Sequence, residues 1–398
     1  MTMFSKDRVN TGRQTEVDIL KAFCIGWMIL LHTQECLAET ENLVFTVSDY
    51  ACTFSGAAAF MICMGLGMRY SRRQSPKERL SRGWELLTVG QLLNLCRNAL
   101  PNLIAWWISG RQFFIANALL VIQADILSFA GLAYLLLAGL RALRVPDGGV
   151  LGLGIALNLA SALLYSAMKS PENYLVSQLA GYFVVTNAES YFPLCSYFIF
   201  VAFGYWLGDV YLRVVDKRRL SARVLAVCAP ICAVWFALRI YGVIPLLPEF
   251  NSYLQYILMP GPDAWATCLL SVVLLAVFCL LSGGRPAHLI ASHMSRHINQ
   301  YYCISYMFIL PMQMLLMLTR GELMPGWLLP TLYAVFVEIA CYFIIEWNER
   351  HLHFGVAKLT GRKRAVAFAA IWIATIAVVA YAWPRIDEFA NVWNDYLL

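Results

Sequence analysis

Residues Glu16–Glu35, EVDILKAFCIGWMILLHTQE, form the stretch that decides how this chain folds. The stretch is mostly apolar, and its length suits a transmembrane helix, which needs about 20 residues. Besides the glutamates at its two ends, it contains the ionisable side chains Asp18, Lys21 and His32. Ionisable groups inside a membrane helix are costly, so these residues are candidates for a functional site.

The spacing of Lys21 and His32 also indicates a functional site. They are eleven residues apart, which on a helix is three turns and about 16 Å of rise. Both side chains therefore lie on nearly the same side of the helix, with the cation near one membrane face and the imidazole deeper. The pattern predicts a site that connects a charged donor on one side of a bilayer to chemistry further across it.

The composition indicates an all-α, polytopic membrane protein. The chain has 398 residues, of which 60% are hydrophobic and 14% charged, with a mean hydropathy of +0.63; a soluble protein carries about 25% charged residues. Hydropathy predicts a bundle of about eleven transmembrane helices near residues 17–36, 51–69, 84–104, 114–140, 149–168, 190–212, 224–243, 264–282, 298–318, 327–347 and 365–383. The segment 174–189 is short and broken by polar residues, so we expect it to be interfacial or re-entrant.

The charges predict the orientation. Lysine and arginine concentrate in cytoplasmic loops, and most of the thirty in this chain fall on one side when the N-terminus is placed inside. The loops on the other side are acidic, so we expect the N-terminus inside and the C-terminus outside. The predicted parts are a cytoplasmic segment 1–15, a transmembrane domain 16–350, a basic loop 351–364, a last helix 365–383 and an outer tail 384–398.

His32 is the candidate catalytic residue. A neutral imidazole can take a proton from a hydroxyl or amine near neutral pH, and a carboxylate beside it, such as Glu35, would fix its tautomer. The ordinary alternative is an interfacial histidine that is hydrogen-bonded to a neighbouring helix.

Arg69, Arg72 and Arg73 follow the second apolar segment, in GLGMRYSRRQ (65–74). Guanidinium groups bind phosphate oxygens in bidentate fashion, so this cluster predicts a phosphate clamp. The alternative is the ordinary basic flank of a membrane helix.

Asp125 lies within a long apolar run, and Arg97 lies late in the third segment. Two interpretations remain open. The two residues form a structural ion pair, or Asp125 orients the histidine or an acceptor.

Several motifs are missing from the sequence. It has no phosphate-binding glycine loop, no HExxH and no Cys/His cluster with metal spacing, so ATP-driven transport and a metal cofactor have no support. Nothing indicates nucleic-acid binding. Most of the twelve cysteines lie in apolar segments and are expected to be buried. A disulfide between Cys36 and Cys52 stays open.

Several of these residues resemble known family motifs. Asp18-x-x-Lys21, with His32 following after ten residues, is similar to the signature of acyltransferase family 3, and Arg69-Tyr-Ser-Arg72 resembles its Arg-x-x-Arg motif. Three segments look more like heparan-α-glucosaminide N-acetyltransferase-like membrane proteins: FMICMGLGMRYS (60–71), DILSFAGL (125–132) and FPLCSYFIFVAFGYWLG (192–208). FIIEWNER (343–350) is similar to the end of the acyltransferase-3 core.

The resemblance implies a ten-helix acyltransferase core, to which this chain adds one C-terminal helix. It also implies transfer of an acyl group, usually acetyl, from cytosolic acyl-coenzyme A to a sugar or other polar acceptor. His32 would be the catalytic histidine, Lys21 its motif partner, and Arg69 and Arg72 donor-side residues. Lys21 departs from the commoner arginine and lacks the planar guanidinium fork.

The sequence therefore predicts a multi-pass acyltransferase of a bacterial inner membrane. It would be an O- or N-acetyltransferase that uses acetyl-CoA and modifies a cell-envelope or lipid-linked glycan. Asp18, Lys21 and Asp125 would assist His32, and Arg73 would join the two donor-side arginines. The alternatives are a transporter or flippase for such a glycan and a non-catalytic assembly partner. The acceptor, the acyl group, an acyl-histidine intermediate and a homo-oligomeric state stay open.

Overall fold

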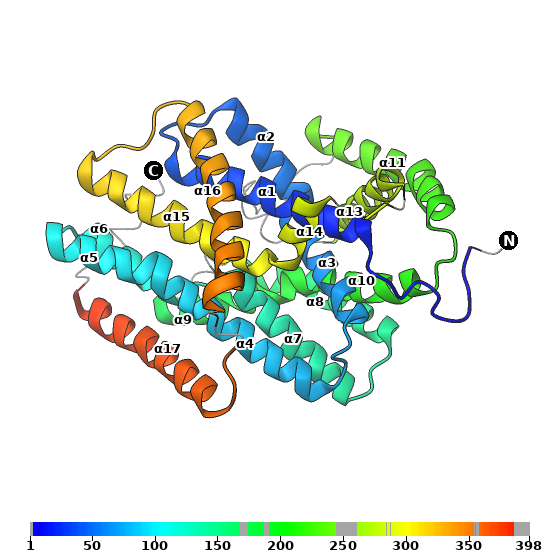
Figure 1. Cartoon of the computed structure of the whole chain (residues 1–398), viewed down its shortest axis with the longest axis horizontal. Coiled ribbons are helices and arrows are strands. Elements are labelled where there is room, and N and C mark those ends of the chain that lie inside the picture. Colours follow the sequence, from blue (N-terminus) through cyan, green and yellow to red (C-terminus); the bar gives the residue numbers. More distant parts are fainter. Residues whose placement is uncertain are drawn as a thin grey trace. The chain divides into compact units, whose positions relative to one another are not determined.

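The computed structural model describes residues 3–167, 174–186, 191–243, 261–283, 285–286, 288–353, 355 and 358–385. The regular secondary structure of these residues is helical (Figure 1), and only two isolated β-bridges occur among them. The helices in the first half are α1 (Thr15–Leu37), α2 (Leu43–Ala51), η1 (Cys52–Gly56), α3 (Ala57–Tyr70), α4 (Pro76–Asn94), η2 (Leu95–Ala99), α5 (Leu100–Ser109), α6 (Gln112–Ala118), η3 (Leu119–Ile122), α7 (Ile126–Ala142) and α8 (Asp147–Ala167). Those in the second half are α9 (Tyr174–Gly181), α10 (Leu194–Leu212), α11 (Lys217–Ile240), α13 (Pro262–Ser282), α14 (Leu289–Arg296), α15 (Ile298–Thr319), α16 (Leu328–Trp347), η4 (Asn348–Leu352), α17 (Gly361–Ala382) and η6 (Trp383–Arg385).

The all-helical fold class is confirmed for the described residues. Each apolar segment of the sequence falls on helical structure, and seven helical segments in the described part are long and apolar enough to cross a membrane. The count of eleven crossings and the orientation stay predictions. Helix α9 has eight residues, so it rises only about 12 Å, far less than the thickness of a bilayer.

One predicted helix differs from the expectation. The apolar run 114–140 is not one continuous helix, because residues 123–125 leave the helical conformation between η3 and α7. Irregular backbone at membrane depth must have its polar groups satisfied inside the protein. The side chains that satisfy them belong to the functional site and are described there.

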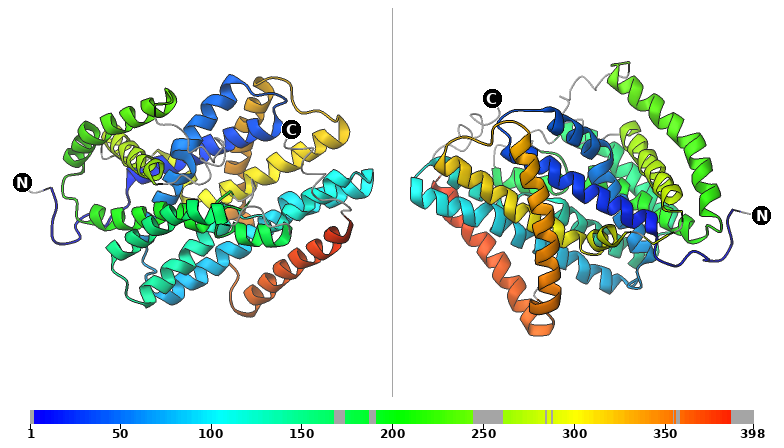
Figure 2. Two further views of the ribbon diagram at one scale, coloured as in Figure 1. Left: turned by 180° about the vertical axis from the view of Figure 1, so that it is seen from behind. Right: turned by 45° about the horizontal axis from the view of Figure 1, so that its top comes forward.

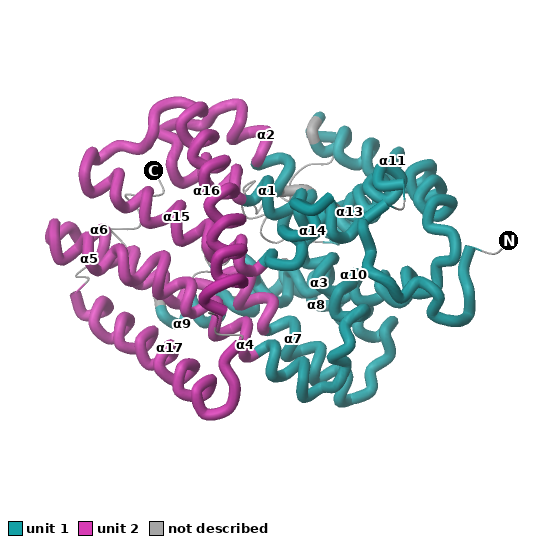
Figure 3. Tube along the Cα trace, viewed as in Figure 1, with its two compact units in different colours: residues 1–28, 49–83, 132–298 teal, residues 29–48, 84–131, 299–398 magenta. Residues whose placement is uncertain are grey.

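The chain divides into two compact units (Figure 3). Unit 1 contains residues 1–28, 49–83 and 132–298, and unit 2 contains residues 29–48, 84–131 and 299–398. Helices α1, α2, α4 and α7 contribute residues to both units, and the first residue of α15, Ile298, belongs to unit 1. The domain boundaries predicted from the sequence are not tested by this division. Residues 386–398 of the predicted outer tail and 187–189 of the predicted re-entrant segment lie outside the described residues.

Unit 1 is built on α10, which packs against α3 and α8, and on a second pair, α11 with α13 (Figure 2). Glycines let α3 and α10 approach closely. A Cβ at Gly65 would lie 2.1 Å from the Val201 carbonyl oxygen, and one at Gly204 would lie 2.1 Å from that of Ile62. The segments 60–71 and 192–208, which resemble one family, therefore meet face to face along this helix pair.

Unit 2 contains α5, α6, η3 and α17, which pack together, and the helices α15 and α16. Helix α17 is attached to the preceding part of the unit by polar contacts: Trp372 Nε1 donates to Thr88 Oγ1 at 3.2 Å, and Arg364 lies 3.4 Å from Glu85. The last residue of α1 is tied to the α15–α16 loop, because the Met324 N–H donates to the Leu37 carbonyl at 2.7 Å.

The cysteines carry free thiols, including Cys36 and Cys52. The disulfide left open by the sequence is therefore not formed in this structure.

Candidate functional site

His32 lies near the end of α1, within unit 2, and pairs with a carboxylate. Its Nδ1 is 2.9 Å from Glu35 Oε2, one turn further along the helix, and 28% of its side chain is exposed. A carboxylate only accepts hydrogen bonds, so a neutral imidazole here carries its proton on Nδ1 and keeps a lone pair on Nε2. This is the arrangement that a general base requires.

Tyr306 on α15 connects the histidine to a buried arginine. Its ring centre lies 5.1 Å from that of His32, and the Arg97 guanidinium carbon lies 4.6 Å from the same ring centre. Arg97 is 5% exposed and projects from the π-helical turn η2. Cation–π contact with Tyr306 helps to stabilise this buried charge. The sequence did not single out Tyr306, whose only signal was its place in a tyrosine-rich helix.

Asp125 pairs with Arg97 and begins a helix. Its Oδ1 accepts the Ser128 N–H at 2.8 Å, which caps α7, and its Oδ2 lies 3.6 Å from Arg97 Nη2. The ion pair considered from the sequence is thus present. No hydrogen bond between Asp125 and His32 occurs in the described part of the chain, where Glu35 is the carboxylate at the imidazole.

Asn94 stabilises the interruption before α7. Its amide nitrogen donates to the carbonyls of Val121 at 3.2 Å and Gln123 at 2.8 Å, and its Oδ1 accepts from Arg97 Nε at 3.1 Å. One buried amide therefore satisfies two carbonyls that the break leaves without helical partners. The same contacts fix the guanidinium of Arg97.

Asp18 and Lys21 lie on α1 within unit 1. Asp18 accepts from Arg13 Nε at 2.5 Å and from Ser295 Oγ at 2.6 Å. Lys21 is partly buried, and its ammonium has no hydrogen-bond or ion-pair partner among the residues that the structure describes. Asp18 thus has structural partners, whereas the charge of Lys21 stays unpaired within this part of the chain.

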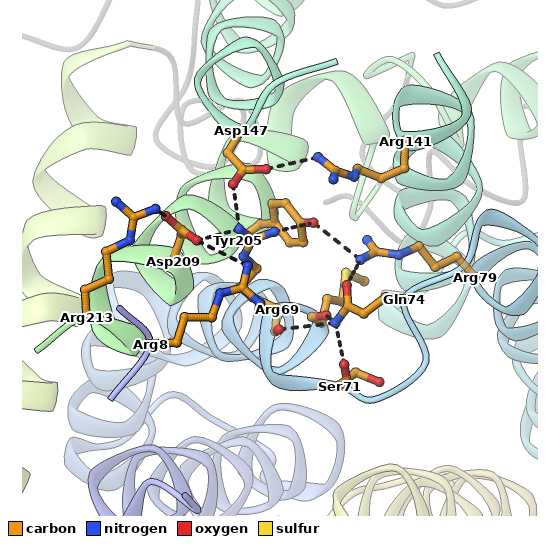
Figure 4. A network of polar contacts seen from close by, with 11 residues as sticks. Arg8, Arg69, Ser71, Gln74, Arg79, Arg141, Asp147, Tyr205, Asp209 and Arg213 are labelled. Carbon is orange, nitrogen blue, oxygen red and sulfur yellow. Dashed lines mark hydrogen bonds and ion pairs between the residues drawn. The ribbon is translucent and has the colours of Figure 1, made fainter. Parts of the chain in front are cut away.

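Arg69 is the centre of a network within unit 1 (Figure 4). Its Nη2 contacts the carboxylates of Asp209 and of Asp147, the latter at 2.9 Å, and its Nη1 donates to the Tyr205 hydroxyl at 3.2 Å. Only 11% of the side chain is exposed. Gly208 makes this position possible, because a Cβ there would lie 2.7 Å from Arg69 Cβ. Arg69 is therefore already paired with two carboxylates.

Arg79 is the buried arginine that sequence reasoning missed. It is 2% exposed, its Nη2 donates to Gln74 Oε1 at 2.6 Å and to the Tyr205 hydroxyl at 3.4 Å, and its guanidinium lies 5.2 Å from the Tyr205 ring centre. Its Nε and Nη1 have no hydrogen-bond partner in the described structure. Buried donors without a partner are costly. In the sequence this residue is simply one of several basic residues that follow α3.

The Gln74 side chain holds the turn that carries Arg72 and Arg73. Gln74 Nε2 donates to the carbonyls of Met68, Arg69 and Ser71, while its Oε1 accepts from Arg79 (Figure 4). Arg72 and Arg73 are exposed, and their guanidinium groups form no hydrogen bond or ion pair within the described residues. The turn therefore has two exposed arginines, and the buried Arg79 follows it in α4.

Helix α4 begins in a capping box, which fixes the position of Arg79. The Ser75 hydroxyl and N–H donate to Glu78 Oε2 at 2.7 and 3.1 Å, and the Glu78 N–H donates to Ser75 Oγ at 3.3 Å. The bond from the Ser75 hydroxyl, with that from its N–H, lowers the pKa of the Glu78 carboxyl from its ordinary value.

The network of Figure 4 has an excess of positive charge. Two aspartates, Asp147 and Asp209, face a larger set of arginines: Arg8, Arg69, Arg79, Arg141 and Arg213. Arg72 and Arg73 add to this charge from the adjoining turn. Such a site suits a polyanion, because guanidinium groups bind phosphate oxygens strongly.

The fold and these polar groups define the class, an integral membrane protein with ionisable residues inside its helices. Residues 13–242 match the family model described as "Heparan-alpha-glucosaminide N-acetyltransferase, catalytic". The match covers more than half of the chain, so the chain belongs to this family of membrane acetyltransferases. Comparison with curated proteins gave no match, and comparison with solved structures gave none. The matched region includes His32, Arg79 and Arg97, whereas Tyr306 follows it.

Proposed function

We propose that this protein transfers an acetyl group from acetyl-CoA to a hydroxyl or amine of a cell-envelope or lipid-linked glycan in a bacterial inner membrane. The observation that carries the proposal is the His32–Glu35 pair at 2.9 Å, within the region that belongs to the acetyltransferase family. The bilayer, the acyl donor and a polar acceptor are the partners that this reaction needs.

The proton moves as follows. Nε2 of His32 takes the proton of the acceptor hydroxyl or amine while the acceptor oxygen or nitrogen attacks the thioester carbonyl. The bond from carbon to sulfur then breaks, and the imidazolium returns the proton to the leaving thiolate. Glu35 holds Nδ1–H throughout and stabilises the imidazolium. Tyr306 packs against the imidazole and is itself held by the Arg97–Asp125 ion pair.

The arginines of unit 1 are the donor-binding residues in this proposal. The guanidinium groups of Arg72 and Arg73 form no hydrogen bond or ion pair in the described part of the chain, and Arg79 has two buried nitrogens without a hydrogen bond. All three suit the phosphates of coenzyme A. Arg69, which is paired with Asp209 and Asp147, would hold the cluster in place. Lys21 would offer a further unpaired cation on α1, and Asp18 would position that helix through Arg13 and Ser295.

A glycan transporter is the second candidate, and the interruption at residues 123–125 favours it. Transporters often place substrate groups at broken membrane helices. The two functions differ in the donor, because only the acetyltransferase requires binding of coenzyme A. Titration of the purified protein with coenzyme A separates them, and absence of binding would favour the transporter.

The direct test is replacement of His32 by alanine. Purified His32→Ala should release coenzyme A from radiolabelled acetyl-CoA about 10²-fold or more slowly than wild type, since general base catalysis contributes this much. His351→Ala is the matched control, because this exposed histidine on η4 lies outside the proposed site, and it should retain full activity. Wild-type turnover by His32→Ala would refute the mechanism.

A further inference from the structure

A groove lies between the ends of α15 and α16 in unit 2, with a volume of about 530 Å³. This is within the usual range of about 300–1,000 Å³ for ligand sites. Its walls are mainly apolar and include Leu315, Leu316, Leu329, Leu332 and Phe336. The groove therefore suits a hydrocarbon chain.

A positively charged side chain, Arg320, lines one end of the groove. Arg320, the first residue after α15, lines it, and its guanidinium has no partner among the described residues; Glu322, two residues further along, forms no ion pair with it there. Arg111 Nη1 donates to the Met317 carbonyl, one turn before Arg320, at 3.4 Å. Two guanidinium groups thus lie at the end of α15. Charge complementarity favours an anionic group at this end of the groove.

The positions of these residues along the helices match a membrane interface. The apolar wall residues lie in the last turns of α15 and the first turns of α16, which are both candidate membrane spans, and Arg320 lies just beyond α15. Exposed Trp327, beside the start of α16, is typical of the interface. Phosphate groups of lipids occur at this level, with their chains beside the apolar residues.

The groove is also connected to the proposed catalytic helix. Met324 lines it, and the Met324 N–H donates to the carbonyl of Leu37, the last residue of α1. Leu37 is five residues after His32, about 7.5 Å along the helix. A headgroup held at Arg320 would therefore extend toward the end of α1 that carries the His32–Glu35 pair.

We infer that the acceptor is an amphiphile whose apolar chain lies in this groove and whose phosphate binds Arg320, so that its sugar is presented to His32. This inference rests on the proposed function, and it selects a phosphate-bearing, lipid-linked sugar over a free glycan. The groove would hold the acceptor at the membrane surface. Such anchoring raises the effective concentration of the sugar at the imidazole.

Binding is tested without acetyl-CoA, with radiolabelled dodecyl phosphate as the probe and the full chain in phosphatidylcholine nanodiscs. We expect saturable binding at one site per chain. Leu332→Trp, which fills the groove, and Arg320→Ala, which removes the cation, should each weaken it about tenfold or more. Ile339→Trp, at a similarly exposed position two turns further along α16, and Arg223→Ala, an exposed arginine on α11, should bind as wild type.

Three outcomes would overturn the inference. They are equal binding by Leu332→Trp and Ile339→Trp, no preference for dodecyl phosphate over dodecanol, and loss of binding when phosphatidylglycerol is added, which would assign the groove to bulk lipid. A transfer assay extends the test: Leu332→Trp should slow acetylation of dodecyl-phosphate-linked glucosamine but not that of free glucosamine. Because the binding assay needs no catalysis, it can fail while His32 remains essential, and the reverse also holds.

Discussion

Arg79 is a single residue whose burial requires an explanation. Its guanidinium is 2% exposed, no carboxylate contacts it among the described residues, and two of its nitrogens lack hydrogen bonds. Tyr205 and Gln74 satisfy the third nitrogen only. A phosphate oxygen would supply the missing acceptors and the missing charge.

Replacement of Arg79 by alanine should therefore weaken coenzyme A binding by about 10- to 100-fold, since hydrogen bonds to charged groups contribute about 1.5–3 kcal/mol. Isothermal titration with coenzyme A measures this loss. S-acetylpantetheine, which has no phosphate, should bind wild type and Arg79→Ala equally.

Lys77→Ala is the matched control, because Lys77 lies on the same helix and is exposed. It should bind coenzyme A within about twofold of wild type, as expected for a screened surface charge. If Arg79→Ala lost affinity for both ligands to the same degree, Arg79 would have a structural role and no contact with phosphate.

At the scale of elements, the α3–α10 pair positions the arginine network. Gly65 and Gly204 allow the two backbones to approach, and Gly208 makes room for Arg69 beside Asp209. The close contact is thus what brings a cation of one helix to a carboxylate of the other. A substitution at one of these glycines can disrupt the helix contact without changing any charged residue.

Gly65→Ala should destabilise the fold by about 1–3 kcal/mol, because its methyl group would meet the Val201 carbonyl and force the helices apart. Gly67→Ala, two residues along the same helix, meets nothing within 4 Å and should be neutral or stabilising by up to about 1 kcal/mol. Thermal unfolding in one detergent compares the two. Equal unfolding midpoints would show that the helices are not held by this contact.

The interruption before α7 shows where sequence reasoning loses information. Hydropathy located the apolar segments well, because burial in lipid depends on composition along the chain. It could not show that residues 123–125 leave the helix, because Asn94, which satisfies the freed carbonyls, lies far away in sequence. The pairing of Asp125 with Arg97 was considered from their polarity, yet its geometry depends on this break.

The candidate site likewise contains residues that the sequence revealed and residues that it did not. His32 and Glu35 were found because their spacing places them one turn apart on a single helix. Arg79 and Tyr306 were missed because their importance comes from burial and from partners on other helices: Tyr205 for the former, His32 and Arg97 for the latter. Single-sequence patterns contain no information on such long-range contacts.

At the scale of the whole molecule, the predicted orientation can be tested with two loops. Whether an odd or an even number of membrane crossings separates them decides whether they lie on opposite sides or on the same side of the membrane. One loop, 143–146, follows α7 and contains Arg144; the other, 320–327, connects α15 to α16 and contains Glu322. Five of the apolar segments predicted to cross lie between them, from 149–168 to 298–318. An odd number of crossings places the loops on opposite sides, and the positive-inside rule places Arg144 in the cytoplasm.

Short epitope tags inserted after Arg144 and after Glu322 should therefore differ in intact bacterial cells: antibody should label the second tag, and the first only after permeabilisation. The prediction depends on whether the segment around α9 crosses the membrane. Its eight residues rise about 12 Å, so it should add no crossing. Were the segment around α9 to cross as well, the number of crossings between the two loops would be even, and both tags would lie on one side. Labelling of both tags in intact cells, or of neither, would therefore contradict the predicted orientation.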